Sequence, residues 1–116
     1  KAWLAFREQL AGLSARGAAL TRQGVQARRP PVSALTERLQ GLRVPTLIVT
    51  GDEDDPCLGP ALVLKREIPS SGLVVFPRTG HTINLEEPLL FNQVVLEFLH
   101  KVEAGRWFLR GQGAPS

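Results

Sequence analysis

The sequence contains a single cysteine, Cys57, and no long apolar run. One cysteine excludes an internal disulfide and offers no thiolate cluster for a zinc site. No stretch approaches the roughly 18 to 20 consecutive apolar residues that a membrane-spanning helix needs. Charged residues at Arg7 and Glu8 interrupt the apolar N-terminal stretch, so we do not expect a secretory signal there. One cysteine is compatible with a reducing compartment, and we expect a cytoplasmic protein with no metal site and no membrane partner.

Acidic residues are also scarce at the N-terminal end, where Glu8 is the only one before Glu37. The net charge of +3 is therefore uneven, and Arg22, Arg28 and Arg29 fall in one early stretch. A basic stretch can attract nucleic acid, but this one lacks interleaved aromatics, zinc-finger spacing and an RNA-binding signature. We expect a solvated loop and no nucleic-acid partner, although these arginines could bind an acidic substrate.

What is present is an ordinary globular composition, with 43% hydrophobic and 22% charged residues, which fits one small domain. Residues 1–42 are expected to be helical. An amphipathic helix is predicted from an apolar face made of Trp3, Phe6, Leu10 and Leu13, with Leu20 following. The pattern is lost from Thr21 to Pro31, and a short helix should follow, with Ser33 as its cap and Leu35, Leu39 and Leu42 on its apolar face.

A different pattern begins at Pro45. Residues 46–50 and 73–76 are short apolar runs, which predict strands buried on both faces. Helices are expected over 58–68 and from about Pro88 to Gly105. This order is typical of a βαβα unit of a parallel sheet. Because two strands alone would leave unpaired backbone groups at both edges, we expect the rest of the sheet to lie outside these residues.

A polar loop follows each predicted strand: an acidic loop over 52–56 and a second loop that ends at His81. Functional loops of a parallel sheet gather at the carboxyl ends of its strands, so neighbouring strands would bring the acids close to His81. A carboxylate that accepts the histidine Nδ1–H fixes the tautomer and leaves the other nitrogen to act as a general base. By composition alone, Asp52, Asp54 and Asp55 all compete for this role.

The segment 44–54, VPTLIVTGDED, resembles the penultimate core strand and acid loop of α/β-hydrolases, P-T-L-hydrophobic-hydrophobic-x-G-x-x-D. The segment 76–88, FPRTGHTINLEEP, resembles the histidine loop of the same family, G-H-x-x-x-x-E-x-P. The resemblance implies that Asp54, at the last position of G-x-x-D, is the triad acid and that His81 is the base. Glu87 is expected to support the start of the last helix.

The resemblance covers about residues 43–104. It implies an α/β fold, namely the C-terminal part of an α/β-hydrolase with its last two parallel strands and flanking helices. Residues 1–42 would be the end of a helical cap or lid, 43–104 the C-terminal part of the core, and 105–116 a tail.

The nucleophile elbow of this family, G-x-S-x-G, is absent. A serine nucleophile would then lie upstream of Lys1, and this chain alone should be inactive. The implied activity is cofactor-independent hydrolysis of an ester, lactone, thioester or C–C bond in a small-molecule substrate, with the remainder of the hydrolase core as partner. An aspartate nucleophile would instead indicate a dehalogenase or an epoxide hydrolase. A non-catalytic binding or interaction protein on the same fold is the alternative.

Overall fold

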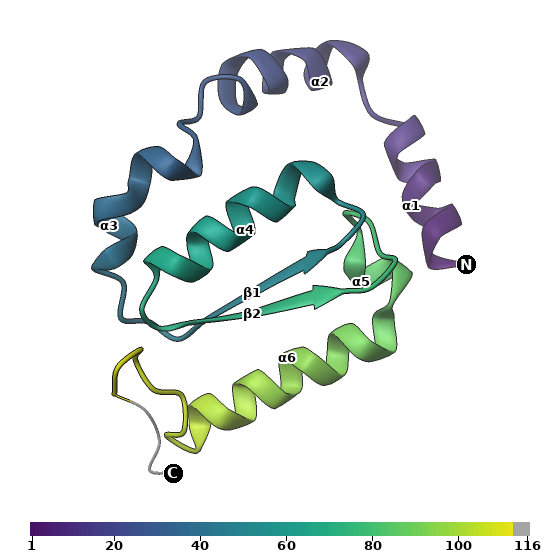
Figure 1. Ribbon diagram of the computed structural model, residues 1–116. Coiled ribbons are helices and arrows are strands. Elements are labelled where there is room, and N and C mark those ends of the chain that lie inside the picture. Colours follow the sequence, from purple (N-terminus) through teal and green to yellow (C-terminus); the bar gives the residue numbers. More distant parts are fainter. Residues whose placement is uncertain (113–116) are drawn as a thin grey trace. The chain divides into compact units, whose positions relative to one another are not determined.

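The computed structural model describes residues 1–112, in two compact units that divide between Pro31 and Val32. The expected tail over 105–116 therefore lies partly outside the described residues. Figure 1 shows the elements of each unit in chain order.

The N-terminal unit is mostly helical, but it is not built as predicted. Helix α1 spans Ala2–Ala11, α2 spans Ala15–Thr21, and a π-helical turn follows at Arg22–Gln26. The prediction of one helix running past Leu13 is wrong, because Ser14 caps a new helix by accepting a hydrogen bond from the Gly17 amide at 3.1 Å. The prediction that regular structure ends at Thr21 is also wrong, since helical structure continues to Gln26.

The C-terminal unit begins with a short 3₁₀ helix, Val32–Leu35, and helix α3, Thr36–Gln40. Ser33 is not the cap that was expected. The N-cap position of α3 is Leu35, which makes no side-chain cap bond. The Ser33 carbonyl instead accepts a hydrogen bond from Thr36 Oγ1 at 2.8 Å.

Two parallel strands form the centre of this unit, as the sequence predicts. Strand β1, Thr46–Gly51, pairs with β2, Ser71–Phe76, in a register that runs from Thr46 opposite Ser71 to Gly51 opposite Phe76. Helix α4, Asp55–Glu67, connects them, and a short helix α5, Ile83–Glu86, precedes α6, Pro88–Glu103. Helix α4 begins three residues before the predicted start because Pro56 fits the first turn of a helix.

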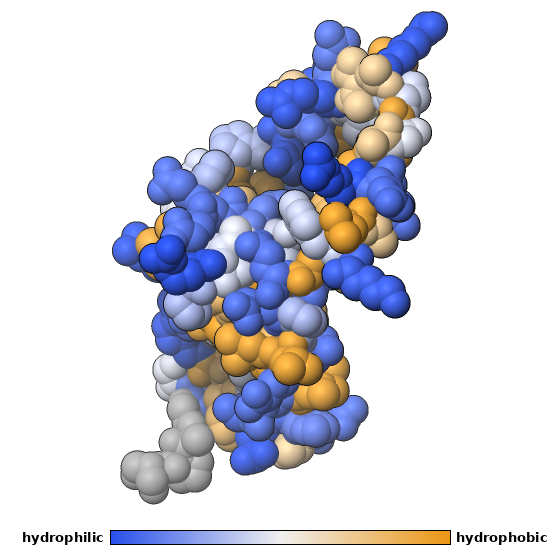
Figure 2. All heavy atoms as spheres, turned by 90° about the vertical axis from the view of Figure 1, so that its right-hand side faces the viewer, coloured by the Kyte–Doolittle hydropathy of each residue, from blue (hydrophilic) through white to orange (hydrophobic). Residues whose placement is uncertain are grey.

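The buried apolar core is small and consists of Ile48, Ala61, Ile68, Phe76 and Ile83. The expectation that both strands are buried on both faces is wrong for β2, where Val75 is 44% exposed. Helix α6 has no buried residue, despite its predicted apolar stripe. Apolar surface is visible on this unit in Figure 2, and its most exposed apolar side chain is Leu89 at 85%. Within residues 1–112 the sheet therefore lacks the neighbours that would cover it.

The segment after α6 is held at the amino-terminal ends of the strands. Trp107 Nε1 donates a hydrogen bond to the Ser70 carbonyl at 2.6 Å, and its ring meets Phe98 edge-on at 4.8 Å. The Arg110 guanidinium donates to the carbonyls of Lys65 and Arg66. These carbonyls belong to the last turn of α4, which has no intrahelical donors for them. The segment therefore caps that helix.

None of the helices within residues 1–112 is both long enough and apolar enough to cross a lipid bilayer.

Candidate active site

The loops that follow β1 and β2 are joined by hydrogen bonds to and from the backbone of Thr79. Glu53 N donates to the Thr79 carbonyl at 3.0 Å, and Thr79 N donates back to Asp52 Oδ1 at 3.2 Å. Thr79 is almost completely buried, at 1% exposure. Asp52 thus fastens the two loops together, whereas the sequence alone leaves it as a competitor for the acid role.

The junction needs a glycine at the end of β1. A β-carbon at Gly51 would overlap the Thr79 carbonyl and would lie 2.5 Å from the Gly80 oxygen. Any side chain would therefore force the loops apart. The glycine of the G-x-x-D pattern is explained by this close backbone approach.

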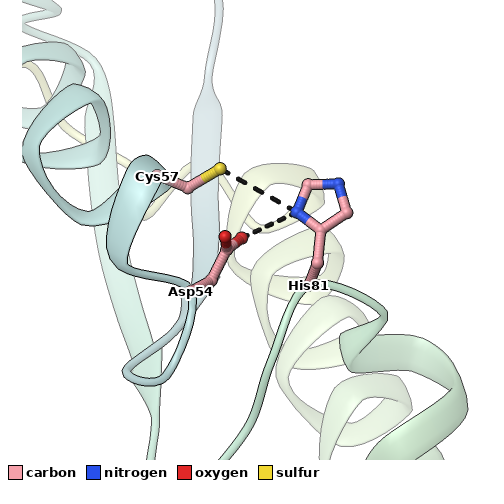
Figure 3. A group of neighbouring side chains, drawn as sticks. All are labelled: Asp54, Cys57 and His81. Carbon is pink, nitrogen blue, oxygen red and sulfur yellow. Dashed lines mark hydrogen bonds and ion pairs between the residues drawn. The ribbon is translucent and has the colours of Figure 1, made fainter.

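Asp54 and His81, 27 residues apart, meet at this junction. His81 Nδ1 lies 2.7 Å from Asp54 Oδ2 (Figure 3). The Asp54 side chain is only 12% exposed, whereas that of His81 is 78% exposed. The pair therefore has a sheltered acid and an accessible imidazole.

Asp54 also occupies the N-cap position of α4 yet makes no cap hydrogen bond. Aspartate is among the preferred N-cap residues because its carboxylate normally accepts a bond from the first helical turn. Here the carboxylate is turned to His81 instead. A capping interaction worth about 1 kcal/mol is therefore given up in favour of the contact with the imidazole.

The loop that carries His81 is fastened by Glu86. Its Oε1 accepts a hydrogen bond from Gly80 N at 3.1 Å, and its Oε2 accepts one from Thr82 Oγ1 at 3.3 Å. These bonds hold the residues on both sides of His81. Glu87, which was expected to support the start of the last helix, stands at the N-cap position of α6 and makes no side-chain cap bond there. Glu86 is the acid of G-H-x-x-x-x-E-x-P and was not a predicted site residue, although the motif contains it.

Cys57 is a third member of the cluster and was not a predicted site residue. It stands three residues after Asp54 in the first turn of α4, and its Sγ lies 3.8 Å from His81 Nδ1 (Figure 3). Hydrogen bonds from His81 and, next in importance, from Cys57 hold the pKa of Asp54 below its ordinary value. The carboxylate is thus kept ionised beside the imidazole.

The cluster borders a cavity of about 230 Å³. Asp54, Cys57 and His81 line part of it, and the remaining walls are largely apolar: Ile48, Val49, Pro60, Ala61, Leu64 and Ile83. An apolar hollow with a few polar groups at one side is the usual form of a small-molecule site.

The other acids and bases considered from the sequence are not drawn into this cluster. Asp55 is an exposed residue in the first turn of α4. Arg22, Arg28 and Arg29 are exposed residues of the N-terminal unit. The structure therefore brings together Asp54 and His81, as predicted, and adds Cys57 and Glu86.

No protein-family model matches the chain. Among curated proteins, a Bacillus subtilis protein assigned as 2-succinyl-6-hydroxy-2,4-cyclohexadiene-1-carboxylate synthase is 32% identical over 69 residues, which cover 60% of this chain and 25% of that protein. A proline iminopeptidase of Saccharolobus solfataricus is 34% identical over 68 residues, covering 59% of this chain and 22% of that protein. The solved structure of MenH from S. aureus matches at 36% identity with a TM-score of 0.56, covering 58% of this chain and 25% of that one.

The chain is homologous to the C-terminal part of α/β-hydrolases. It spans about a quarter of the length of these relatives. The relatives are α/β-hydrolase fold enzymes, and this agrees with the parallel strands, the connecting helix and the two loops described above.

Proposed function

We propose that the protein carrying this sequence is a hydrolase in which Asp54 and His81 are the acid and the base of a nucleophile–acid–base triad. The observation that carries the proposal is the 2.7 Å contact between Asp54 Oδ2 and His81 Nδ1 at the carboxyl ends of adjacent strands. The nucleophile, a serine, would belong to a segment upstream of Lys1.

The chemistry follows from the two ring nitrogens of His81. With Nδ1–H bonded to Asp54, the neutral tautomer leaves a lone pair on Nε2. Nε2 takes the proton of the serine hydroxyl as the oxygen attacks a carbonyl carbon. The imidazolium formed is stabilised by the adjacent carboxylate, and it then donates the proton to the leaving group. No cofactor is required for these steps.

The substrate class is a small molecule with a cleavable carbonyl: an ester, lactone, thioester or activated C–C bond. The iminopeptidase relatives add the amide of an N-terminal proline to this range. The helical residues 1–42 would be the end of a cap or lid. The rest of the core would pack on the exposed apolar faces of the sheet and α6.

The test is labelling with a fluorophosphonate, which reacts with an activated serine, followed by intact mass measurement of the denatured protein. We expect one adduct per polypeptide, its formation slowed at least a hundredfold by His81→Gln and unchanged by His100→Gln, which alters an exposed histidine on α6. A labelling rate that is the same in His81→Gln as in the wild type would contradict the proposal.

A protein that gains no adduct and hydrolyses none of these substrates would support the alternative of a binding protein on the same fold. An aspartate nucleophile would also resist fluorophosphonate. It would be recognised by a covalent ester formed with a haloalkane or an epoxide, in keeping with a dehalogenase or an epoxide hydrolase.

A further inference from the structure

We propose that Asp54, Cys57 and His81 form a binding site for a soft divalent cation of the zinc type. One ligand atom from each of these side chains lies within 4.8 Å of the other two. Carboxylate, thiolate and imidazole are all zinc ligands, and three protein ligands leave a fourth position for water. The site overlaps the acid–base pair of the proposed function and would compete with it.

The separation between the Cys57 sulfur and the His81 nitrogen is close to that of a tetrahedral zinc site. Zinc bonds of about 2.3 Å to sulfur and about 2.0 Å to nitrogen imply an S···N separation of about 3.5 Å. The observed Sγ–Nδ1 distance is 3.8 Å. The Nδ1–Oδ2 distance of 2.7 Å would have to widen by about half an ångström, because a cation would replace the proton between those atoms. The exposed His81 ring has room to make this small movement.

Helix α4 predisposes the thiol to act as a ligand. Cys57 is in the first turn of this 13-residue helix, where the unpaired amides favour a negative charge. Its position three residues after the N-cap Asp54 places the two side chains on the same side of the turn. The ionised Asp54 carboxylate supplies the second negative charge.

Binding of a metal ion at this site would prevent His81 from acting as a base. A metal on Nδ1 takes the lone pair that the neutral ring has there, so the ring proton must sit on Nε2. Nε2–H cannot accept a proton from a nucleophile. The balanced step is Zn²⁺ plus the Cys57 thiol, the neutral His81 and the Asp54 carboxylate giving the neutral complex plus one proton released from sulfur. We infer that zinc inhibits the enzyme, and this second part rests on the proposed function.

Cobalt(II) titration of the full protein tests the site itself. A tetrahedral cobalt–thiolate centre gives a near-ultraviolet charge-transfer absorption and intense visible bands, neither of which depends on enzyme activity. We expect saturation at one ion per chain and displacement by Zn²⁺. Cys57→Ser should abolish the charge-transfer absorption and weaken binding at least about tenfold, and His100→Gln should change neither. Saturation without thiolate absorption, or equal affinity in Cys57→Ser, would overturn the site.

Inhibition is measured separately, as the fluorophosphonate labelling rate with and without Zn²⁺, each variant being compared with its own metal-free rate. We expect labelling to be suppressed in the wild type, restored by a chelator and resistant to zinc in Cys57→Ser. Cobalt binding without any loss of labelling would retain the metal site and overturn its inhibitory effect. Absence of labelling in metal-free protein would instead contradict the proposed function while the cobalt result still stands.

Discussion

The carbonyl oxygen of Thr79 fills the space that a β-carbon on Gly51 would occupy. This contact sets the distance between the loops that carry Asp54 and His81, because Glu53 N bonds to the same carbonyl. The end of β1 and the loop after β2 are thus held together by backbone atoms, and the side chains of the pair project from a junction that does not depend on them.

Replacing Gly51 by alanine is expected to destabilise the protein by about 1–3 kcal/mol, because an overpacked position forces its surroundings to shift. Activity should fall by more than the loss of folded protein, since the displaced loop carries His81. Urea unfolding and the hydrolysis rate of the folded fraction measure the two effects. Gly59→Ala is the control, because a β-carbon there meets nothing within 4 Å. A wild-type hydrolysis rate in folded Gly51→Ala would show that the junction does not position the pair.

Replacing Asp54 by asparagine should lower kcat by about 10³- to 10⁴-fold, because an amide at that position holds the wrong imidazole tautomer and cannot stabilise the imidazolium. Steady-state kinetics on an ester substrate measures this change. The matched control is Asp55→Asn, one residue further along on an exposed position, which should retain its activity within about twofold. The reverse order of effects would assign the acid role to Asp55.

Stability should depend on pH through Asp54. Its pKa in the folded protein is held below 3.8, the ordinary value, by the bonds from His81 and Cys57. The ionised carboxylate therefore contributes stability that is fully present above the unfolded-state value and is lost as the pH falls through the lowered folded pKa. Urea denaturation over pH 6 to 2 measures the unfolding free energies of the wild type and Asp54→Asn. The wild type should be the more stable of the two at pH 6, and its advantage should decrease below about pH 4. A difference that is constant over this range would contradict the bond.

Glu86 should act as a positioning residue for His81. Glu86→Ala removes the acceptor of the Gly80 amide and the Thr82 hydroxyl, and we expect kcat to fall about tenfold with little change in KM. Because a role through His81 would also shift the acidic limb of the kcat–pH profile, that profile is the deciding measurement. Glu87→Ala is the neighbouring control and should leave both kcat and the profile unchanged.

Much of the C-terminal unit was predictable because its signals are local. The apolar runs at 46–50 and 73–76 predicted the strands, and Pro88 predicted the start of α6. The position of His81 near the acids followed from the rule that loops gather at the carboxyl ends of parallel strands. The choice of Asp54 over its neighbours came from the family motif rather than from composition.

The errors arise where local patterns compete with interactions that the sequence does not display. The helix predicted past Leu13 is divided because the Ser14 hydroxyl captures the Gly17 amide, a bond that ends one helix and begins the next. The prediction that both strands are buried was wrong for β2, because burial depends on neighbours that are not among residues 1–112. Cys57 was missed because the helix was predicted to begin at residue 58, whereas α4 begins at Asp55 and so places Cys57 in its first turn beside Asp54 and His81.

The proposed acid and base lie on one continuous βαβ unit, with Asp54 after β1 and His81 after β2. Their contact therefore needs no residue contributed from a distant part of the chain. In the proposed enzyme, both groups that handle the proton would therefore come from the single stretch that begins at β1, and the nucleophile would come from another segment.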